Sequence, residues 1–213
     1  MVKRIGYCFL CENVASKVML KKHVFKEHNH GEERVFLMMA DTNYRGEPYW
    51  LYFALPLNGT LKDIDAFLRD MWCECCHHAS NFKNGLDDLP MDTRWSKVKN
   101  SVLKYTYDYS GDRTEIFVSC YGEIKREKQA EGIELLARNL RPFKSCDHCE
   151  ESATLYAKGE SEKHFCCQNC AEKVPNENND IYWLHLSNSP RSGVCSYEED
   201  FKKWQVPNEL EHF

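Results

Sequence analysis

The sequence predicts a core of mixed α and β structure that carries two small zinc-binding modules. Three observations lead to this prediction: short apolar runs typical of strands, one amphipathic pattern typical of a helix, and three cysteine pairs that each enclose two residues. The chain has 213 residues, of which 42% are hydrophobic and 29% charged. Such a composition is that of a soluble globular protein, and the length suits one ordinary domain with appendages or two small domains.

The first part of the core is expected to contain two strands and a helix. Residues 35–40 form an apolar run short enough for a buried strand, and residues 49–55 form a second, aromatic-rich strand. Thr60 is a good N-cap because Asp63 follows three residues later. Apolar side chains then recur at helical spacing at Leu61, Ile64, Leu68, Met71, Trp72 and Cys75. We therefore expect the main helix to run from Thr60 to about Cys75.

Further strands are expected in the second half of the chain. Residues 103–109 and 114–120 are strand-like, and the Ser-Gly-Asp-Arg segment at 110–113 predicts a hairpin between them. The short apolar run at 132–138 fits either a strand or a helical turn. A polar linker is expected at 175–180, and the last thirty residues look irregular.

The strongest metal-binding signal is Cys146-x2-Cys149-x17-Cys167-x2-Cys170. Two residues between cysteines let a tight turn direct both thiolates at one ion, and two such turns complete a closed tetrahedral zinc site. Redox-active or free thiols are the alternative, but two pairs at this spacing are typical of zinc. Cys166 could replace Cys167 as a ligand, and His148 or His164 could also substitute. Four protein ligands leave no position for water, so this site is expected to be structural.

A second candidate zinc site follows the two-cysteine, two-histidine finger pattern Cys8-x2-Cys11-x11-His23-x4-His28. Leu20 stands where such fingers place a core residue, but their usual aromatic residue is missing, so Val14 or Ala15 must fill its place. His30 competes with His28 as the fourth ligand, and a metal-free hairpin is the alternative. We expect the finger to be a separate small unit with a structural ion.

A third group, Cys73-x-Cys75-Cys76-His77-His78, follows the main helix. Adjacent helical residues point in different directions, so all five side chains cannot bind one ion. Cys75 continues the apolar stripe of the helix, which favours a buried structural thiol and a core-and-turn arrangement. The alternative is a metal site in which Cys76 and His78 join a distant ligand such as Cys195.

The charge distribution limits contact with nucleic acid to the N-terminal part of the chain. The net charge is −5, yet residues 1–30 carry a local balance of +4. On the finger helix, the positions that usually meet bases fall at Ser16, Met19 and Lys22, and Met19 is a poor base reader. We therefore expect an unknown protein partner, or weak non-specific nucleic-acid binding, through residues 1–30.

Several function classes are disfavoured by the sequence. No apolar run reaches the ~18 residues of a membrane span, and the N-terminus lacks the features of a signal peptide. We therefore expect a cytoplasmic protein, in which twelve cysteines indicate metal binding more than disulfides. No Gly-rich phosphate loop, nucleophile elbow or zinc-protease motif occurs. Asp108, Asp112 and Glu115 could form a carboxylate cluster, but acids beside a turn are usually solvated.

Four segments resemble a known family. They are 55–70 (LPLNGTLKDIDAFLRD), 105–115 (YTYDYSGDRTE), 133–139 (IELLARN) and 188–197 (NSPRSGVCSY). They are similar to the plasmid pRiA4b ORF-3-like family, also described as insertion-element passenger proteins, in a prokaryotic branch that bears zinc modules. The resemblance covers roughly residues 35–200 and implies an α+β roll, in which a curved antiparallel sheet packs on the main helix. It brings no established activity.

Two positions depart from the pattern of that branch. The chain has Cys75-Cys76-His77-His78 where Cys-Cys-Gly-His is expected, so that a glycine is lost at His77. It also has Cys195-Ser196-Tyr197 where Cys-Gly-Tyr is usual.

The expected organisation has four parts: a zinc finger at 1–31, the roll at 32–142, the four-cysteine zinc module at 143–174, and an irregular tail at 175–213 that packs on the roll. We expect an uncharacterised, non-enzymatic adaptor with two structural Zn²⁺ ions, no catalytic residues and no membrane association. The alternative is a hydrolytic or nucleic-acid-processing metalloenzyme, with a site between the Asp108–Glu115 hairpin and the Cys76–His78 corner.

Overall fold

The computed structural model describes residues 5–44, 47–127, 132–158, 163–174, 182–195, 197 and 206. Twelve strands lie in these ranges: β1 (Ile5–Cys8), β2 (Val14–Ser16), β3 (Glu33–Tyr44), β4 (Glu47–Pro56), β5 (Ser80–Asn84), β6 (Asp87–Leu89), β7 (Leu103–Tyr107), β8 (Thr114–Arg126), β9 (Glu134–Asn139), β10 (Leu155–Lys158), β11 (Lys163–Cys166) and β12 (Trp183–His185). The same ranges contain the helices α1 (Lys17–Glu27), α2 (Leu61–Leu68) and α3 (Gln168–Ala171), a π-helical turn (Arg69–Cys73) and a 3₁₀ turn (Trp95–Lys97). The linker predicted at 175–180 lies outside the described residues.

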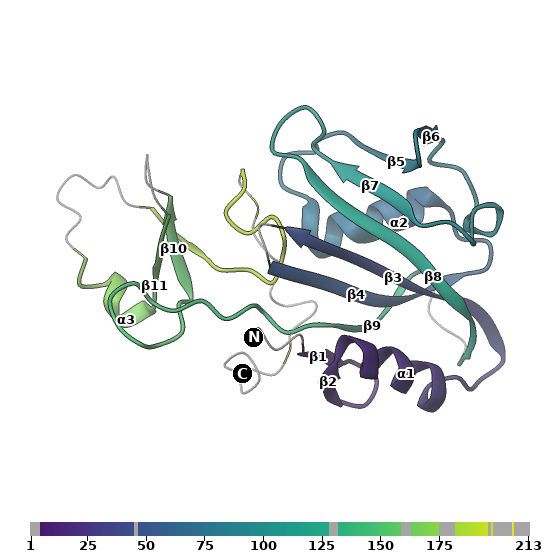
Figure 1. The fold of residues 1–213 in the computed structure, drawn as a ribbon, viewed down its shortest axis with the longest axis horizontal. Helices are drawn as coiled ribbons and strands as arrows, with labels where there is room; N and C mark the ends of the chain where they lie inside the picture. The colour runs from purple at the N-terminus through teal and green to yellow at the C-terminus, as the bar shows by residue number, and fades with distance from the viewer. Residues whose placement is uncertain are drawn as a thin grey trace.

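The strands form two antiparallel sheets (Figure 1). Nine of them make an open sheet in the order β2-β1-β9-β4-β3-β8-β7-β5-β6, and β11-β10-β12 form a small second sheet. The strands predicted from the apolar runs are present, and the ambiguous run at 132–138 is largely strand β9. In the part of the chain that the structure describes, no helix is long and apolar enough to cross a membrane.

The central strands β3 and β4 are buried on both faces. In β3, Phe36 and Met38 belong to one hydrophobic cluster, whereas Val35 and Leu37 belong to a second. Successive side chains of a strand point to opposite faces, so the two clusters lie on the two sides of the sheet. Burial on both sides explains why these strands read as continuous apolar runs.

Helix α2 covers the first face and begins as predicted. Thr60 Oγ1 accepts a hydrogen bond from the Asp63 N–H at 3.3 Å, and the Asp63 carboxylate accepts one from the Thr60 N–H at 2.8 Å. This reciprocal capping box satisfies two donors that have no partner within the helix. The buried side chains of α2 join the cluster that contains Phe36.

The main helix ends earlier than expected, because α-helical bonding gives way to the π-helical turn. The Glu74 N–H donates to the Arg69 carbonyl at 2.9 Å, which is a five-residue step. The Trp72 carbonyl instead accepts the Ser189 hydroxyl at 2.7 Å, from a segment 117 residues further along the chain. The spacing of apolar residues along the main helix gives no sign of a hydrogen-bond donor so far away in the sequence.

The finger is built into the large sheet, in contrast to the separate unit expected from the sequence. Strand β1 pairs with β9, so that Gly6 lies opposite Asn139. A β-carbon at Gly6 would lie 2.3 Å from the Arg138 carbonyl oxygen and from the Trp50 ring, so the approach requires glycine. Helix α1 covers the second face of the sheet, opposite α2, through its buried Leu20 and Val24, which belong to the same hydrophobic cluster as Val35.

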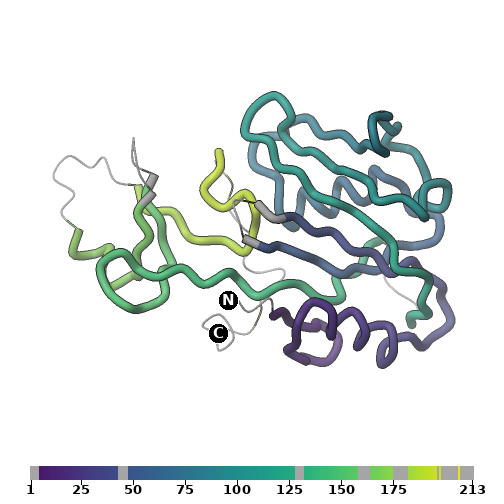
Figure 2. Tube along the Cα trace, viewed as in Figure 1, coloured from purple at the N-terminus to yellow at the C-terminus, as the bar shows by residue number. Residues whose placement is uncertain are grey.

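After the small sheet the chain returns to the large one (Figure 2). We call residues 186–195 the C-terminal strap. The Leu186 N–H donates to the Thr154 carbonyl at 2.9 Å, which holds one end on the small module. The Asn188 side chain donates to the Asn139 carbonyl at 2.7 Å, which holds the strap on β9. The strap thus links the two sheets, and most of the tail beyond it lies outside the described residues.

Candidate metal centres

Three groups of Cys and His side chains each place four potential ligand atoms within 4.8 Å of one another. Each could hold a metal ion. They are Cys8, Cys11, His23 and His28; Cys146, Cys149, Cys167 and Cys170; and Cys75, Cys76, His78 and Cys195. We call them the finger cluster, the four-cysteine cluster and the corner cluster. The first two contain the eight residues that the sequence singled out as zinc ligands, whereas the third had been the less favoured alternative.

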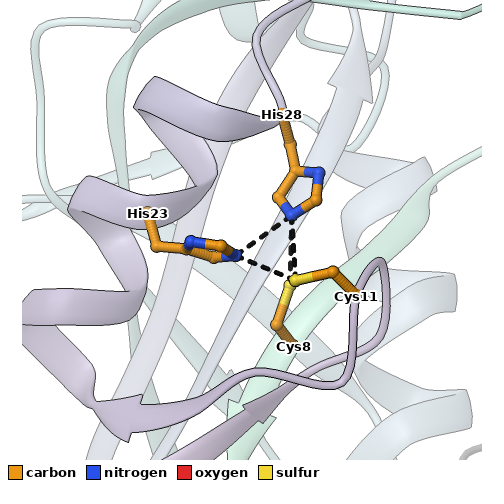
Figure 3. Close-up of side chains that lie close together, drawn as sticks. All are labelled: Cys8, Cys11, His23 and His28. Carbon is orange, nitrogen blue, oxygen red and sulfur yellow. Dashed lines mark hydrogen bonds between the residues drawn. The ribbon is translucent and has the colours of Figure 1, made fainter.

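The finger cluster lies between the β1–β2 hairpin and helix α1 (Figure 3). Cys11 Sγ is 3.0 Å from His23 Nε2 and 3.3 Å from His28 Nε2, and the two Nε2 atoms are 3.1 Å apart. Cys8 Sγ lies 3.7 Å from His28 Nε2. His30 is outside the group, with its ring centre 6.5 Å from that of His28. The structure therefore places His28, not His30, beside the other three side chains.

Local sequence explains how the finger side chains are held. Ser16 caps α1 by accepting a hydrogen bond from the Met19 N–H at 3.4 Å, so its hydroxyl is engaged within the finger. Glu12, next to Cys11, has a φ of 63° and closes the turn between the strands in the left-handed region. Ala15 packs against the cluster that contains Leu20, whereas Val14 is 37% exposed. Ala15 thus takes the place of the missing aromatic residue.

Burial shifts the pKa of two side chains of the finger cluster, Cys8 and His28. It raises the pKa of the Cys8 thiol to about 11, and the neighbouring Cys11 adds to the effect. Burial and the nearby His23 ring lower the pKa of His28, which favours its neutral form. Neutral imidazole is the form that binds metal, and a bound dication would replace the Cys8 proton.

The four-cysteine cluster joins the turn before β10 to the start of α3. Cys149 Sγ lies 3.7 Å from both Cys167 Sγ and Cys170 Sγ. Burial raises the pKa of Cys146, but hydrogen bonds from the backbone N–H groups of Cys167 and His148 outweigh it and lower that pKa to about 6. Hydrogen bonds with Cys167 and Cys149 raise the pKa of Cys170. Four crowded sulfurs of this kind cannot all ionise without a compensating cation.

The alternative ligands named for this module lie outside the group. Cys166 is buried, with its Sγ 4.0 Å from that of Cys146, but it does not join the four sulfurs that converge. His148 and His164 are also absent from the group. The structure thus brings together the two cysteine pairs with the spacing identified in the sequence.

The corner cluster combines the turn after the π-helical segment with the C-terminal strap. Cys195 Sγ lies 3.3 Å from Cys76 Sγ and 3.6 Å from His78 Nε2. Cys75, expected to be a buried core thiol, is half-buried and belongs to the group. The fully buried residue of this stretch is instead Cys73, in the cluster with α2. His77 points outward, with 93% of its side chain exposed.

The carboxylates of the hairpin do not gather at one place. Asp108 is buried and faces Arg191 and His78. Glu115 instead pairs with Lys104 at 3.2 Å. Two cavities, of about 710 Å³ beside α2 and about 370 Å³ between β3 and β8, contain no residue of the three clusters. Of the hairpin carboxylates, Asp108 thus contacts the corner cluster, whereas Glu115 does not.

Comparisons with known proteins leave the family open. No family model and no curated protein matches the chain. Among solved structures, the chain is similar to the crystal structure of MM3350, a protein of unknown function from Methanosarcina mazei Go1, with 18% identity and a TM-score of 0.43. The similarity covers 50% of this chain and 69% of that chain. The resemblance to the pRiA4b ORF-3-like family stays a prediction.

Proposed function

We propose that the chain is a non-enzymatic adaptor of the α+β roll type, in which Zn²⁺ ions at the finger cluster and the four-cysteine cluster have structural roles. Each cluster offers four soft or borderline ligands, the set that closed zinc sites use. The partner is a protein segment that carries both apolar and acidic side chains. The observation that carries this proposal is the solvent-facing side of α1.

That side of α1 combines exposed apolar residues with lysines. Val18, Met19 and Phe25 are 57%, 56% and 45% exposed, although α1 buries Leu20 and Val24 on its other side. Lys22 and Lys26 are also exposed. We call these five exposed residues the α1 face. Large exposed apolar side chains that group together on one element are typical of binding surfaces.

Of the exposed lysines, Lys26 pairs with Glu27 at 3.2 Å, and the other two lysines of α1 are half-buried and contact the sheet. Lys17 pairs with Asp41 at 2.5 Å, and the Lys21 ammonium lies 4.2 Å from the centre of the Tyr121 ring. Ser16, at a base-reading position, is used as the helix cap. The α1 face thus carries little unpaired basic charge and much apolar surface. This composition favours a protein partner over the phosphate groups of a nucleic acid.

A capture experiment with matched variants tests the proposal. Immobilised wild type, Met19→Glu/Phe25→Glu and Leu86→Glu are exposed to native lysate, and captured protein and nucleic acid are both identified. Leu86 is a suitable control because it is 95% exposed on the β5–β6 turn, away from α1. One protein should be captured by the wild type and the Leu86 variant but lost from the α1 variant. Equal capture by all three would exclude the α1 face.

Nucleic acid is measured separately with labelled duplex DNA and single-stranded RNA of random sequence. We expect dissociation constants in the range ~10⁻⁴–10⁻⁶ M at physiological salt, with a steep loss as salt rises. Lys22→Glu/Lys26→Glu should abolish this binding and leave the zinc content unchanged. Nanomolar, sequence-selective binding would show that the chain reads nucleic acid and would overturn the proposal.

A further inference from the structure

We propose that the corner cluster is a third zinc site, in which Cys75, Cys76, His78 and Cys195 bind one Zn²⁺ and fasten the C-terminal strap to the end of the main helix. This inference does not involve the partner proposed for α1, but the total number of ions expected includes those of the finger and four-cysteine clusters. The ligand set is three thiols and one imidazole, which is common in structural zinc sites. Binding would replace the thiol protons, which pass to solvent.

The geometry of the donor atoms supports one shared ion. Residues 75–78 and Cys195 are far apart in sequence, yet the Sγ atoms of Cys76 and Cys195 are only 3.3 Å apart. His78 Nε2 lies 3.6 Å from Cys195 Sγ, so the ring presents this nitrogen to the sulfurs. All four donor atoms lie within 4.8 Å of one another, as in the two clusters predicted from the sequence.

The other nitrogen of His78 provides an independent observation. His78 Nδ1 lies 3.4 Å from Asp108 Oδ1, and Asp108 is only 4% exposed. Metal-binding histidines characteristically direct their second ring nitrogen at a carboxylate, which fixes the ring and its tautomer. Asp108 is held in turn by Arg191, whose Nη2 is 3.3 Å from Asp108 Oδ2. A buried carboxylate thus orients Nε2 toward the three sulfurs.

Arg191 also contacts the sulfur of Cys75. It is fully buried, and its Nη2 donates to Cys75 Sγ at 3.4 Å. Three thiolates around one Zn²⁺ carry a net negative charge, and a guanidinium beside them offsets it. Because Arg191 belongs to the strap, the strap supplies both the ligand Cys195 and this compensating charge.

The turn that bears Cys75, Cys76 and His78 is held in place by the core. Arg69 donates to the Glu74 carboxylate and to the His78 carbonyl, each at 2.8 Å. The Tyr107 hydroxyl accepts from the His78 N–H at 3.3 Å. These contacts fix both ends of the ligand-bearing turn, so a metal would enter a largely formed site.

Strained backbone also concentrates at this corner. His77, Asp108 and Cys195 have φ angles of 57°, 57° and 54°, which are uncommon for residues other than glycine. Within the described residues, the one other non-glycine residue with a positive φ is Glu12, beside the finger ligand Cys11. Such strain persists where surrounding interactions determine the backbone, and it is concentrated at functional sites.

Metal analysis of cysteine variants tests the third site. Wild type, Cys195→Ser and Cys120→Ser are purified under reducing conditions, and zinc per chain is measured by elemental analysis. We expect three, two and three ions, respectively. Cys120 is the matched control because it is half-buried and belongs to none of the clusters. Cys195 and Cys76 are exposed, so Cys76→Ser serves as a second ligand variant with little risk to the core.

The orientation of His78 is tested by chelator competition. Asp108→Asn should lower the affinity for the third ion by about 10–100-fold and leave the affinities for the other two ions unchanged. A zinc content of Cys195→Ser and Cys76→Ser equal to that of the wild type would overturn the proposal, whatever the occupancy of the other two clusters. An intact mass that shows a Cys76–Cys195 disulfide in protein purified without reductant, with no third ion, would also overturn it. A failure to find a partner for the α1 face would leave these counts unchanged.

Discussion

The finger and the four-cysteine module use similar ligands but differ in what surrounds them. The finger lies on the large sheet, where Leu20 and Val24 are fully buried beside Val35 and Tyr52. The four-cysteine module has two small hydrophobic clusters. One consists mainly of its own cysteines with Leu155, Ala171 and Trp183, and the other contains Ala153, Tyr156, Leu186, Phe165 and Leu184. A unit with only small apolar clusters depends on a bound metal more than a unit that is docked on a large core does. Similar ligand clusters can therefore differ in their structural importance.

The largest expected effect separates the two modules directly. Cys149→Ser and Cys11→Ser should each remove one zinc ion. Cys149→Ser should also strongly reduce amide protection in β10, β11 and α3, because structural zinc contributes ~10–16 kcal/mol in small zinc-finger peptides and the apolar clusters of the module are small. Cys11→Ser should leave α1 protected, because Leu20 and Val24 still pack on the sheet. Hydrogen exchange with mass spectrometry measures both.

In both variants, protection of β3 and β4 serves as the internal control. If Cys11→Ser removed the protection of α1 as completely as Cys149→Ser removes that of α3, docking would not stabilise the finger and the comparison would fail.

The second prediction concerns the docked face of α1. Leu20→Ala should lower the free energy of unfolding by about 2–5 kcal/mol, because it removes a fully buried side chain between α1 and the sheet. Val18→Ala, on the exposed side of the same helix, should change it by less than about 0.5 kcal/mol. Urea denaturation of the two variants measures the difference. Equal effects would mean that α1 does not pack as described.

A smaller effect is expected where β1 meets β9. Gly6→Ala should cost about 1–3 kcal/mol, because the added methyl group overlaps the Arg138 carbonyl and the Trp50 ring. Gly85→Ala is the matched control, since a β-carbon there meets nothing within 4 Å, although its φ of 61° carries a backbone cost. Thermal unfolding should show the larger loss at Gly6. A larger loss at Gly85 would show that the close approach at β1 is relaxed in solution.

The smallest expected effect is a gain in stability, at the turn that carries the corner cluster. His77→Gly should stabilise the protein by roughly 0.5–1 kcal/mol. Glycine adopts the φ of 57° without strain, and the strain energy removed is larger than the entropy cost of ordering a glycine on folding. For a chain of this size we expect Tm to rise by about 2 °C. His30→Gly, at a position without a positive φ, should give no gain. An unchanged or lower Tm for His77→Gly would show that the His77 side chain contributes more than its backbone costs.

The sequence predicted those features that depend on neighbouring residues. The capping box at Thr60 and the cysteine pairs of the finger and four-cysteine clusters are local patterns, and the structure contains them. The burial of β3 on both faces of the sheet corresponds to the uninterrupted apolar run at residues 35–40 of the sequence. These signals depend on spacing over a few residues, and they need no knowledge of the fold.

Features that depend on distant partners were missed or were left as the less favoured alternative. Ser189 binds the Trp72 carbonyl near the end of the main helix, and the corner cluster brings Cys195 to Cys76 and His78, with Cys75 added and His78 facing Asp108. The short strands β5, β6 and β12 are polar or brief and carry little periodicity. A sequence signal for the corner existed in the paired Cys-His turn and the lone Cys195, but only the fold shows that they meet.

The C-terminal strap has a consequence for the order in which the protein can be completed during synthesis. Cys76 leaves the ribosome 119 residues before Cys195, a delay of roughly 6–24 s at the usual rate of translation. Throughout that interval the Trp72 carbonyl lacks its Ser189 donor, and three ligands of the corner cluster lack their fourth. The finger and the four-cysteine cluster each close within about 25 residues of chain, so they can bind metal as soon as they emerge. The corner is therefore expected to be the last of the three sites to form.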